Sequence, residues 1–240
     1  MTADYWSIFA CAAIWVLFAY LCGSVSFAVV VSRLFGLSDP RTFGSHNPGA
    51  TNVLRTGHKG AALLTLFMDG FKGWVPLVLA KAYVVQNPFL DSSMADFAAN
   101  QNSWEMLTPW IIAGVAMSAF AGHLWPVFFG FKGGKGVATA AGLLFAMHPI
   151  LGLMVLLTWV GVAVVTRYSS LSALLSAAFA PIYLVIGSIY LWKDEFVYAT
   201  PWPLALVSAI MAMLLIYRHK ENVQRLLKGE ESKIFSKKKS

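Results

Sequence analysis

The stretch that decides the fold is KGVATAAGLLFAMHPILGLMVLLTWVGVAVVTR, which runs from Lys135 to Arg167. The apolar segment between these two cations is roughly 31 residues long, too long for one membrane span and too short for two spans of about 20 residues each. His148-Pro149 interrupts it, and a proline ends or kinks a helix. The stretch therefore predicts either one long crossing or a pair of short helices that leaves Lys135 and Arg167 on the same side.

The rest of the chain places this stretch in a membrane. Of its 240 residues, 58% are apolar and only 12% are charged, whereas an average soluble domain carries roughly 25% charged residues. We therefore expect an all-α polytopic membrane helix bundle that forms a single transmembrane domain over residues 1–240. Its other apolar runs cover about residues 5–31, 60–85, 107–129, 171–192 and 202–217.

The distribution of charge chooses between the two topologies. With a pair of short helices, the loops at about 38–59, 130–136 and 167–170 share one side with the basic tail at about 218–240. Cytoplasmic segments carry an excess of Lys and Arg. We therefore predict seven transmembrane segments, one or two of them of half length around His148-Pro149, with the N-terminus outside and the C-terminus in the cytoplasm. The outer side then receives mainly acidic residues: Asp4, Asp91, Asp96, Glu105, Asp194 and Glu195, with only Lys81 and Lys193.

Several kinds of function are excluded or disfavoured by the same sequence. The net charge of +7 follows from the orientation rule, so we expect no nucleic-acid partner. Cys11 and Cys22 both fall within the first apolar run, and no Cys/His spacing suits a metal, so we expect neither a disulfide framework nor a metal site. The run has no Lys or Arg before it, which favours a retained span over a signal peptide. Within the second run, Asp69 and Lys72 are three residues apart and are predicted to form an ion pair.

Directly before the deciding stretch lies a loop that suits phosphate, Gly130-Phe131-Lys132-Gly133-Gly134-Lys135-Gly136. Glycines allow close backbone approach, and a helix beginning at about Val137 would direct free N–H groups into the loop. Lys132, Gly133, Gly134, Lys135 and Gly136 are therefore candidate phosphate-binding residues. A nucleotide P-loop is excluded because it needs a Ser or Thr after the lysine, where Gly136 stands. The alternative is a flexible cytoplasmic turn.

The loop after the first span supplies a second candidate cluster. Short polar residues of this kind are typical of turns and N-caps, so plain capping is one interpretation. The other is an anion pocket in which an arginine makes a bidentate contact to phosphate. In that pocket Thr51 and Asn52 would start the next helix and Arg55 would lie about one turn into it. The candidates are Ser45, Asn47, Thr51, Asn52 and Arg55.

The end of the last span supplies a third cluster. His219 and Asn222 are three residues apart and would share a face if the helix continues. A histidine at a helix C-terminus is also a common dipole partner, so this alternative stays open. We expect the tail from Asn222 onward to be a solvated or headgroup-facing basic segment that contacts membrane lipids.

Four segments together resemble the signature regions of the bacterial acyl-phosphate:glycerol-3-phosphate acyltransferases. They are GSHNPGATNVLRTGHKGAALLTLFMDGFKG (44–73), GHLWPVFFGFKGGKGVATAAG (122–142), RYSSLSALLSA (167–177) and HKENVQRLLKGEE (219–231). On this resemblance the family's first motif falls on Ser45 and Arg55, its second on residues 132–136, and its third on His219 and Asn222. Ser170 matches a polar residue before the sixth span, while Lys220 departs from the usual arginine.

The resemblance implies a multi-pass enzyme of the bacterial inner membrane with its site on the cytoplasmic side. Such an enzyme moves a fatty acyl group from acyl phosphate to the sn-1 hydroxyl of glycerol 3-phosphate, giving lysophosphatidic acid and inorganic phosphate, without a cofactor. A separate peripheral enzyme makes the acyl phosphate and is a candidate partner. Catalytic roles then fall on His219, Asn222 and Ser170, and either His219 or a substrate phosphate takes the hydroxyl proton. The alternative function is transport of an organic phosphate or lipid phosphate, which also uses half-length helices and basic loops.

Overall fold

The computed structural model describes residues 2–86, 102–191 and 201–234, and every regular element in these ranges is a helix, as the sequence predicts. The predicted outer loops, about 87–105 and 193–201, lie almost entirely outside the described residues. The elements are α1 (Thr2–Gly23), α2 (Phe27–Leu34), α3 (Ala50–Leu54), α4 (Lys59–Gln86), α6 (Asn102–Leu124), a 3-10 turn η2 (Val127–Phe129), α7 (Val137–Met147), α8 (Pro149–Thr166), α9 (Ser169–Tyr190), α10 (Trp202–Arg218) and α11 (Lys220–Leu227).

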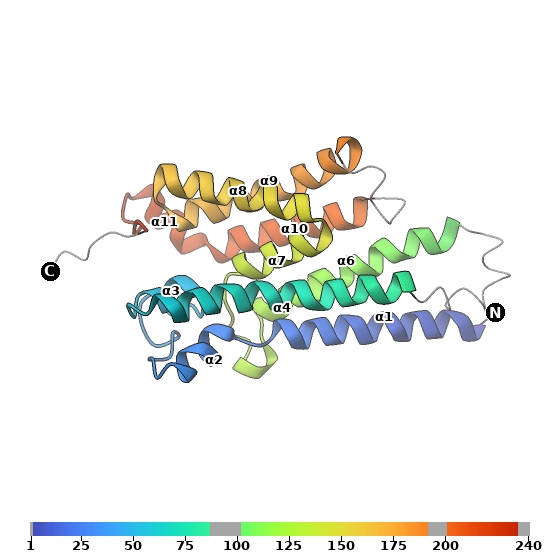
Figure 1. Cartoon of the computed structure of the whole chain (residues 1–240), viewed down its shortest axis with the longest axis horizontal. Coiled ribbons are helices and arrows are strands. Elements are labelled where there is room, and N and C mark those ends of the chain that lie inside the picture. Colours follow the sequence, from blue (N-terminus) through green and yellow to red (C-terminus); the bar gives the residue numbers. More distant parts are fainter. Residues whose placement is uncertain (1, 87–101, 192–200, 235–240) are drawn as a thin grey trace.

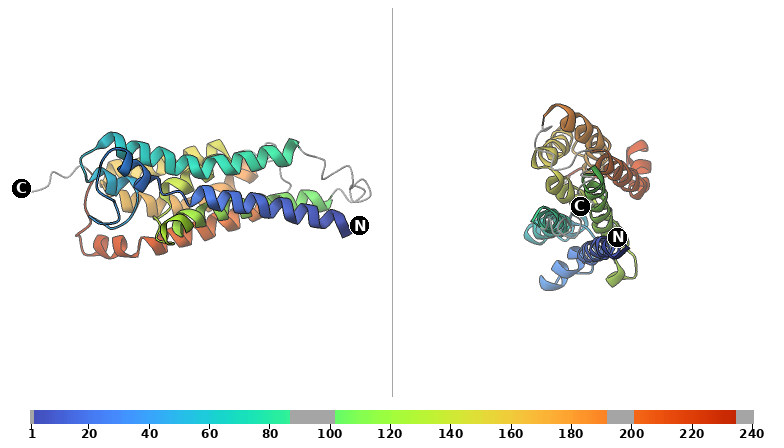
Figure 2. Two further views of the ribbon diagram at one scale, coloured as in Figure 1. Left: turned by 90° about the horizontal axis from the view of Figure 1, so that it is seen from below. Right: turned by 90° about the vertical axis from the view of Figure 1, so that its right-hand side faces the viewer.

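The helices form an elongated bundle (Figure 1). Seen along its length, α6 and α7 lie between the group α8–α10 and the pair α1 and α4 (Figure 2, right). α1 begins at one end of the bundle, while α2, α3 and α11 gather at the opposite end (Figure 1). The start of α1 and the helix α11 therefore lie at opposite ends of the bundle (Figure 1).

The predicted seven segments correspond to six candidate spans and one half-length helix in the described ranges. Four helices, α4, α6, α8 and α9, are long and apolar enough to cross a membrane, and the bent pairs α1/α2 and α10/α11 raise the number to six. α7 has 11 residues, so it is only about 16 Å long against a hydrocarbon core of about 30 Å. It is the half-length segment that the stretch from Lys135 to Arg167 and the charge distribution together predict.

The interruption at His148-Pro149 is where the chain turns back. α7 ends at Met147, His148 is extended, and Pro149 opens α8, so the pair α7/α8 returns to the end from which it started. Because α7 ends inside the bundle, its last carbonyl groups need internal partners. Lys81 supplies them: its Nζ donates to Ala146 O at 2.9 Å and Met147 O at 3.1 Å. The charge pattern assigns Lys81 to the outer side, and in the structure its side chain caps the C-terminal end of α7.

The first span is not the single helix over residues 5–31 that the apolar run predicted. α1 ends at Gly23 and α2 resumes at Phe27 with a bend of 43°. A Cβ on Gly23 would lie 2.1 Å from Ala119 O of α6, so the glycine permits a close crossing there. Lys72 Nζ donates to Val25 O in the break at 2.7 Å and to Asp69 Oδ1 at 2.6 Å. The predicted ion pair between Asp69 and Lys72 is thus confirmed, and it also satisfies the backbone of the break.

Glycine contacts also seat α7 against α4. A Cβ on Gly142 of α7 would lie 2.0 Å from Gly70 O, and one on Gly73 of α4 would lie 2.6 Å from Thr139 O. Small residues let membrane helices approach closely and gain van der Waals contact. The half-length helix is therefore fixed along its side by α4 and at its inner end by Lys81. Its remaining free end, the N-terminus, carries the glycine loop.

Candidate active site

The glycine loop, residues Gly130–Gly136, lies at the N-terminus of α7, which begins at Val137 as the sequence predicts. Two of its glycines are required by space. A Cβ on Gly133 would lie 2.1 Å from His123 O, and one on Gly134 would lie 2.2 Å from His123 Nε2. Gly136 caps the helix with φ of +86°, a conformation that L side chains rarely adopt. The glycine pattern therefore reflects close packing of the loop on α6 and a left-handed turn into α7.

Lys135 links this loop to the helix that follows the last span. Its Nζ donates a hydrogen bond to Asn222 Oδ1 in α11. The pKa of Lys135 is lowered to about 8, mainly by burial and also by the nearby Arg225 and Arg218, while Glu231 and Glu221 act in the opposite direction. The lysine is thus held next to the third cluster with a weakened preference for its charged form.

His219 stands at the bend of 60° between α10 and α11 and is buried. The helix bends at His219, so the condition for a shared face on one continuous helix is not met. The bend nevertheless leaves both His219 and Asn222 buried at the same end. Nδ1 of His219 lies 2.8 Å from Leu215 O, which makes Nδ1 the donor of the neutral ring and leaves the Nε2 lone pair free. The pKa of His219 is lowered to about 4, mainly by burial, with Lys135 and Arg218 acting in the same direction.

Glu231 was not among the predicted site residues, yet it organises this cluster. It accepts hydrogen bonds from Asn222 Nδ2 at 2.7 Å and from Arg225 Nε at 2.7 Å. Burial raises the pKa of Glu231, but hydrogen bonds outweigh burial and the net shift is downward. Asn222 is thereby fixed between Lys135 and Glu231, so its amide orientation is determined on both sides.

The tail, which the sequence predicts to be a solvated or headgroup-facing basic segment from Asn222 to Lys239, contacts the start of α9. It folds back so that Ile234 N–H donates to Arg167 O at 2.7 Å, and Lys233 Nζ lies 5.6 Å from the centre of the Tyr168 ring. Ser170 is the second residue of α9. Its buried Oγ makes no hydrogen bond of standard geometry with the described residues, yet it contributes to the lowered pKa of Glu231. The short polar segment 167–170 is thus joined to the third cluster, as the topology requires. Residues 235–240 lie outside the described part.

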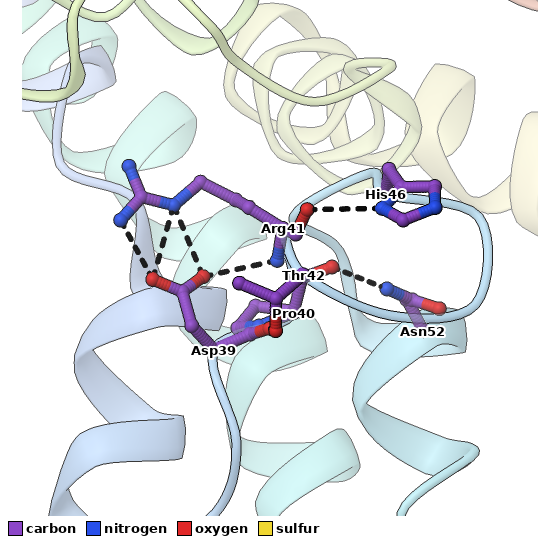
Figure 3. Close-up of polar contacts among 6 residues, drawn as sticks. All are labelled: Asp39, Pro40, Arg41, Thr42, His46 and Asn52. Atoms are coloured by element: carbon purple, nitrogen blue, oxygen red, sulfur yellow. Dashed lines mark hydrogen bonds and ion pairs between the residues drawn. The ribbon is translucent and has the colours of Figure 1, made fainter.

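The first loop is organised by its own side chains (Figure 3). Asn52 is buried and donates to Pro40 O at 2.6 Å and Phe43 O at 3.1 Å, and its Oδ1 accepts from Ser45 N–H at 3.2 Å. Arg41 pairs with Asp39 at 2.6 Å, which holds the pKa of Asp39 below its usual range. Asn52, predicted as a phosphate ligand, therefore has its amide engaged within the loop itself.

Two contacts join the first loop to the glycine loop. Pro48 O lies 3.1 Å from the position that a Cβ on Gly134 would take. The Arg41 guanidinium lies 5.7 Å from the centre of the Phe129 ring, just before the glycine loop. The predicted convergence of four polar segments on one end of the bundle is therefore present, with the glycine loop at its centre.

Five other predicted site residues lie in these loops, and their side chains form no hydrogen bond with the described residues. Arg55 directly follows the short helix α3 and is exposed, rather than lying one turn into a long helix. Its guanidinium rests against Gly44, whose φ is +61°. Among residues 2–86, 102–191 and 201–234, no partner hydrogen-bonds the side chains of Ser45, Asn47, Thr51, Arg55 and Lys132.

Sequence reasoning missed two further contributors besides Glu231. Arg218 reaches the glycine loop and binds its carbonyl groups, and His123 packs its ring and its carbonyl against Gly133 and Gly134. His123 and Glu231 both fall within the quoted signature segments, so the signal was present. In the described residues no group of three or more His, Cys, Asp or Glu side chains could hold a metal ion.

In this membrane helix bundle a helix N-terminus, glycine amides and basic side chains lie together at one end. The fold is that of an integral membrane protein, and this end is suited to binding phosphate. The chain belongs to the glycerol-3-phosphate acyltransferase family, whose sequence model matches residues 13–229. It is 52% identical to a glycerol-3-phosphate acyltransferase of Bordetella petrii over 233 residues, 97% of each chain. It is 50% identical to that of Burkholderia cenocepacia over 226 residues, 93% of this chain and 91% of the relative.

Solved structures agree with this assignment. Two crystal structures of PlsY (YgiH), an integral membrane glycerol 3-phosphate acyltransferase, resemble this chain over 93% of its length and 95% of theirs. The glycerol 3-phosphate form has a TM-score of 0.74 at 35% identity, and the lysophosphatidic acid form has 0.72 at 34%. The multi-pass membrane architecture of the chain is thus shared with a crystallised membrane acyltransferase.

Proposed function

We propose that the protein transfers a fatty acyl group from acyl phosphate to the sn-1 hydroxyl of glycerol 3-phosphate, giving lysophosphatidic acid and inorganic phosphate. The observation that carries this proposal is the meeting of the glycine loop with His219 and Asn222 through Lys135. Phosphate-binding groups and a free imidazole lone pair thereby lie at one site. The relatives named above and the glycerol 3-phosphate and lysophosphatidic acid forms of PlsY support the choice of substrate and product.

Two substrates that both carry phosphate need two sets of counter-charge. The N–H groups at the start of α7, with Lys135 and Lys132, suit one phosphate group, because a helix N-terminus attracts anions. The uncommitted side chains of the first loop suit the other, with Arg55 as its bidentate partner and Ser45, Asn47 and Thr51 as hydrogen-bond donors. Asn52 holds this loop in shape instead of binding phosphate.

The reaction itself needs little from the protein beyond orientation and charge. The glycerol hydroxyl oxygen attacks the acyl carbon, the bond from that carbon to the phosphate oxygen breaks, and phosphate leaves with its electron pair. No covalent acyl-enzyme is required, since phosphate is already a good leaving group. His219 Nε2 accepts the hydroxyl proton, while bound phosphate dianions raise the pKa of this imidazole from its low value in the empty site. Asn222 and Ser170 complete the polar wall around the reacting hydroxyl.

We further propose the bacterial inner membrane as the location, with the site facing the cytoplasm. The positive-inside bias supports this orientation, since the glycine loop, Arg167 and α11 share one end of the bundle. That end faces the compartment where a peripheral enzyme would deliver acyl phosphate. A reporter fused after Arg167 should read out as cytoplasmic, and a periplasmic readout would contradict the orientation.

The function is tested in proteoliposomes supplied with palmitoyl phosphate and radiolabelled glycerol 3-phosphate. We expect label in lysophosphatidic acid and no accumulation of free label in the vesicle lumen. Label that enters the lumen unchanged, with none in lipid, would contradict acyl transfer and support the transport alternative. Empty liposomes and the variant Lys135→Gln serve as controls.

A further inference from the structure

Arg218 is the last residue of α10, and its side chain binds the backbone of the glycine loop. Nη2 donates to Gly133 O at 2.7 Å and to Gly134 O at 2.9 Å, and Nε donates to Gly134 O at 3.1 Å. The side chain is only partly exposed, and 84 positions separate Arg218 from Gly134. Two consecutive carbonyl groups are thus held by one planar guanidinium, whose donors are fixed relative to one another.

These contacts determine the direction of the neighbouring amides. In a trans peptide the C=O and the N–H point in opposite directions. The peptide between Gly133 and Gly134 is held at both ends, since Gly134 N–H donates to His123 O at 3.1 Å. In the next peptide Arg218 holds Gly134 O, so the N–H of Lys135 points away from Arg218.

The backbone N–H groups that follow these two carbonyl groups have no hydrogen-bond acceptor in the described part of the chain. Within the described ranges, none of the backbone N–H groups of Lys135, Gly136, Val137 and Ala138 donates a hydrogen bond. Without Arg218, the partly negative oxygens of Gly133 and Gly134 would be free to turn toward the same side as these donors. An anion would then meet carbonyl oxygens as well as N–H groups, which weakens its binding.

We propose that Arg218 is a positioning residue that locks the glycine loop with its N–H groups presented to the phosphate group of a substrate. The inference rests on the proposed function, because it concerns the same site. Arg218 acts through the loop and not as a phosphate ligand, so the paired geometry of its donors matters and its charge alone does not suffice.

The test compares Arg218→Lys, which keeps the charge, and Arg218→Gln, which removes it, with Lys220→Met. Lys220 is exposed, two residues further along, so its replacement removes a charge from the same region without touching the loop. We expect both Arg218 variants to lose about 10- to 100-fold in kcat/KM for glycerol 3-phosphate, as small misplacements of binding groups do. Lys220→Met should stay within about twofold of the parent. An Arg218→Lys variant with the parent's kcat/KM would overturn the proposal.

Hydrogen exchange supplies a readout that needs no activity. In the Arg218 variants the Gly134 amide should lose protection, whereas the α9 helix should keep it. A loss of activity with unchanged exchange at Gly134 would mean that Arg218 contacts substrate directly and would also overturn the proposal. If the parent showed no acyl transfer at all, the proposed function would fail while this exchange result would still decide the role of Arg218.

A further exchange measurement on the parent protein covers the case in which the variants do not fold. Saturating inorganic phosphate should protect the amides of Lys135, Gly136, Val137 and Ala138 and leave Gly134 as it was. If phosphate changed the protection of Gly134 and not of these four amides, the proposed direction of the N–H groups would be contradicted. The loop would then present the Gly134 N–H to phosphate instead of the four that follow it.

Discussion

The Lys135 ammonium donates a hydrogen bond to Asn222 Oδ1 and so connects the glycine loop to a helix 87 positions further along the chain. Asn222 is in turn held by Glu231, which the folded-back tail brings to the site. The glycine loop and the His219 bend are thereby fixed relative to each other by side chains at the end of the bundle. If the proposed function is right, the charge on Lys135 should affect substrate binding directly.

The pH dependence of substrate capture follows from the lowered pKa of Lys135. Because that pKa is about 8, the lysine is charged below it and loses its proton as the pH rises through it. We expect kcat/KM for glycerol 3-phosphate to fall above about pH 8, since kcat/KM reports the groups of the free enzyme. Lys135→Gln should be about 10- to 100-fold slower near neutrality, the order expected for losing one charge-assisted phosphate contact, and should lack this alkaline decline. An unchanged decline in the variant would assign the titration elsewhere.

Replacing His219 by Gln should remove the proton acceptor while keeping a polar side chain. General-base catalysis contributes about 10²- to 10⁴-fold, so we expect a loss of that size in kcat with a smaller change in KM. Single-turnover measurement of lysophosphatidic acid formation checks it. Turnover close to that of the parent would show that a substrate phosphate takes the proton instead.

Gly134 and Gly161 form a matched pair for testing the close packing of the glycine loop. A Cβ on Gly134 meets His123 Nε2 at 2.2 Å, whereas a Cβ on Gly161 in α8 meets nothing within 4 Å. Gly134→Ala should therefore displace the loop and reduce kcat/KM by at least about tenfold. Gly161→Ala should leave activity unchanged and stabilise α8 slightly, since alanine is the better helix former. Equal effects of the two substitutions on steady-state kinetics would contradict the packing argument.

The buried pair of Asp69 and Lys72 should be more sensitive to losing one member than to losing both. Each side chain is only 4% exposed, so Asp69→Asn leaves an unpaired cation and should cost about 3–5 kcal/mol in unfolding free energy. Asp69→Asn combined with Lys72→Met removes both charges and should cost less. Reversible unfolding in mixed micelles would measure both, and a double variant less stable than the single one would show that the pair itself is stabilising.

Sequence reasoning reached the parts of the fold that depend on local lengths and charge. Length and the proline left one long crossing or two short helices open for the stretch from Lys135 to Arg167, and the charge distribution favoured the pair that includes the half-length α7. The break between α1 and α2 was not predicted, because it depends on Ala119 and Lys72, which approach from other helices. The capping role of Lys81 was not predicted either, since its partners are carbonyl groups of another helix.

In the candidate site, too, features set by local sequence could be predicted, whereas those that depend on contacts from distant segments could not. The glycine loop could be recognised in the sequence because its glycines and lysines lie directly between apolar runs. Arg218 and Glu231 looked like ordinary members of a basic tail, because their roles depend on the bend at His219 and on the return of the chain to Arg167. Arg55, Ser45 and Lys132 remain predictions as phosphate ligands, and their open side chains are what such a role requires.

The most direct test is made on the detergent-purified protein with palmitoyl phosphate, with no CoA or metal added. Inorganic phosphate release is followed with and without glycerol 3-phosphate. We predict release that depends on glycerol 3-phosphate and matches the lysophosphatidic acid formed, mole for mole. Folded protein in active lipid that releases no phosphate, or releases it equally without glycerol 3-phosphate, would contradict acyl transfer at this site.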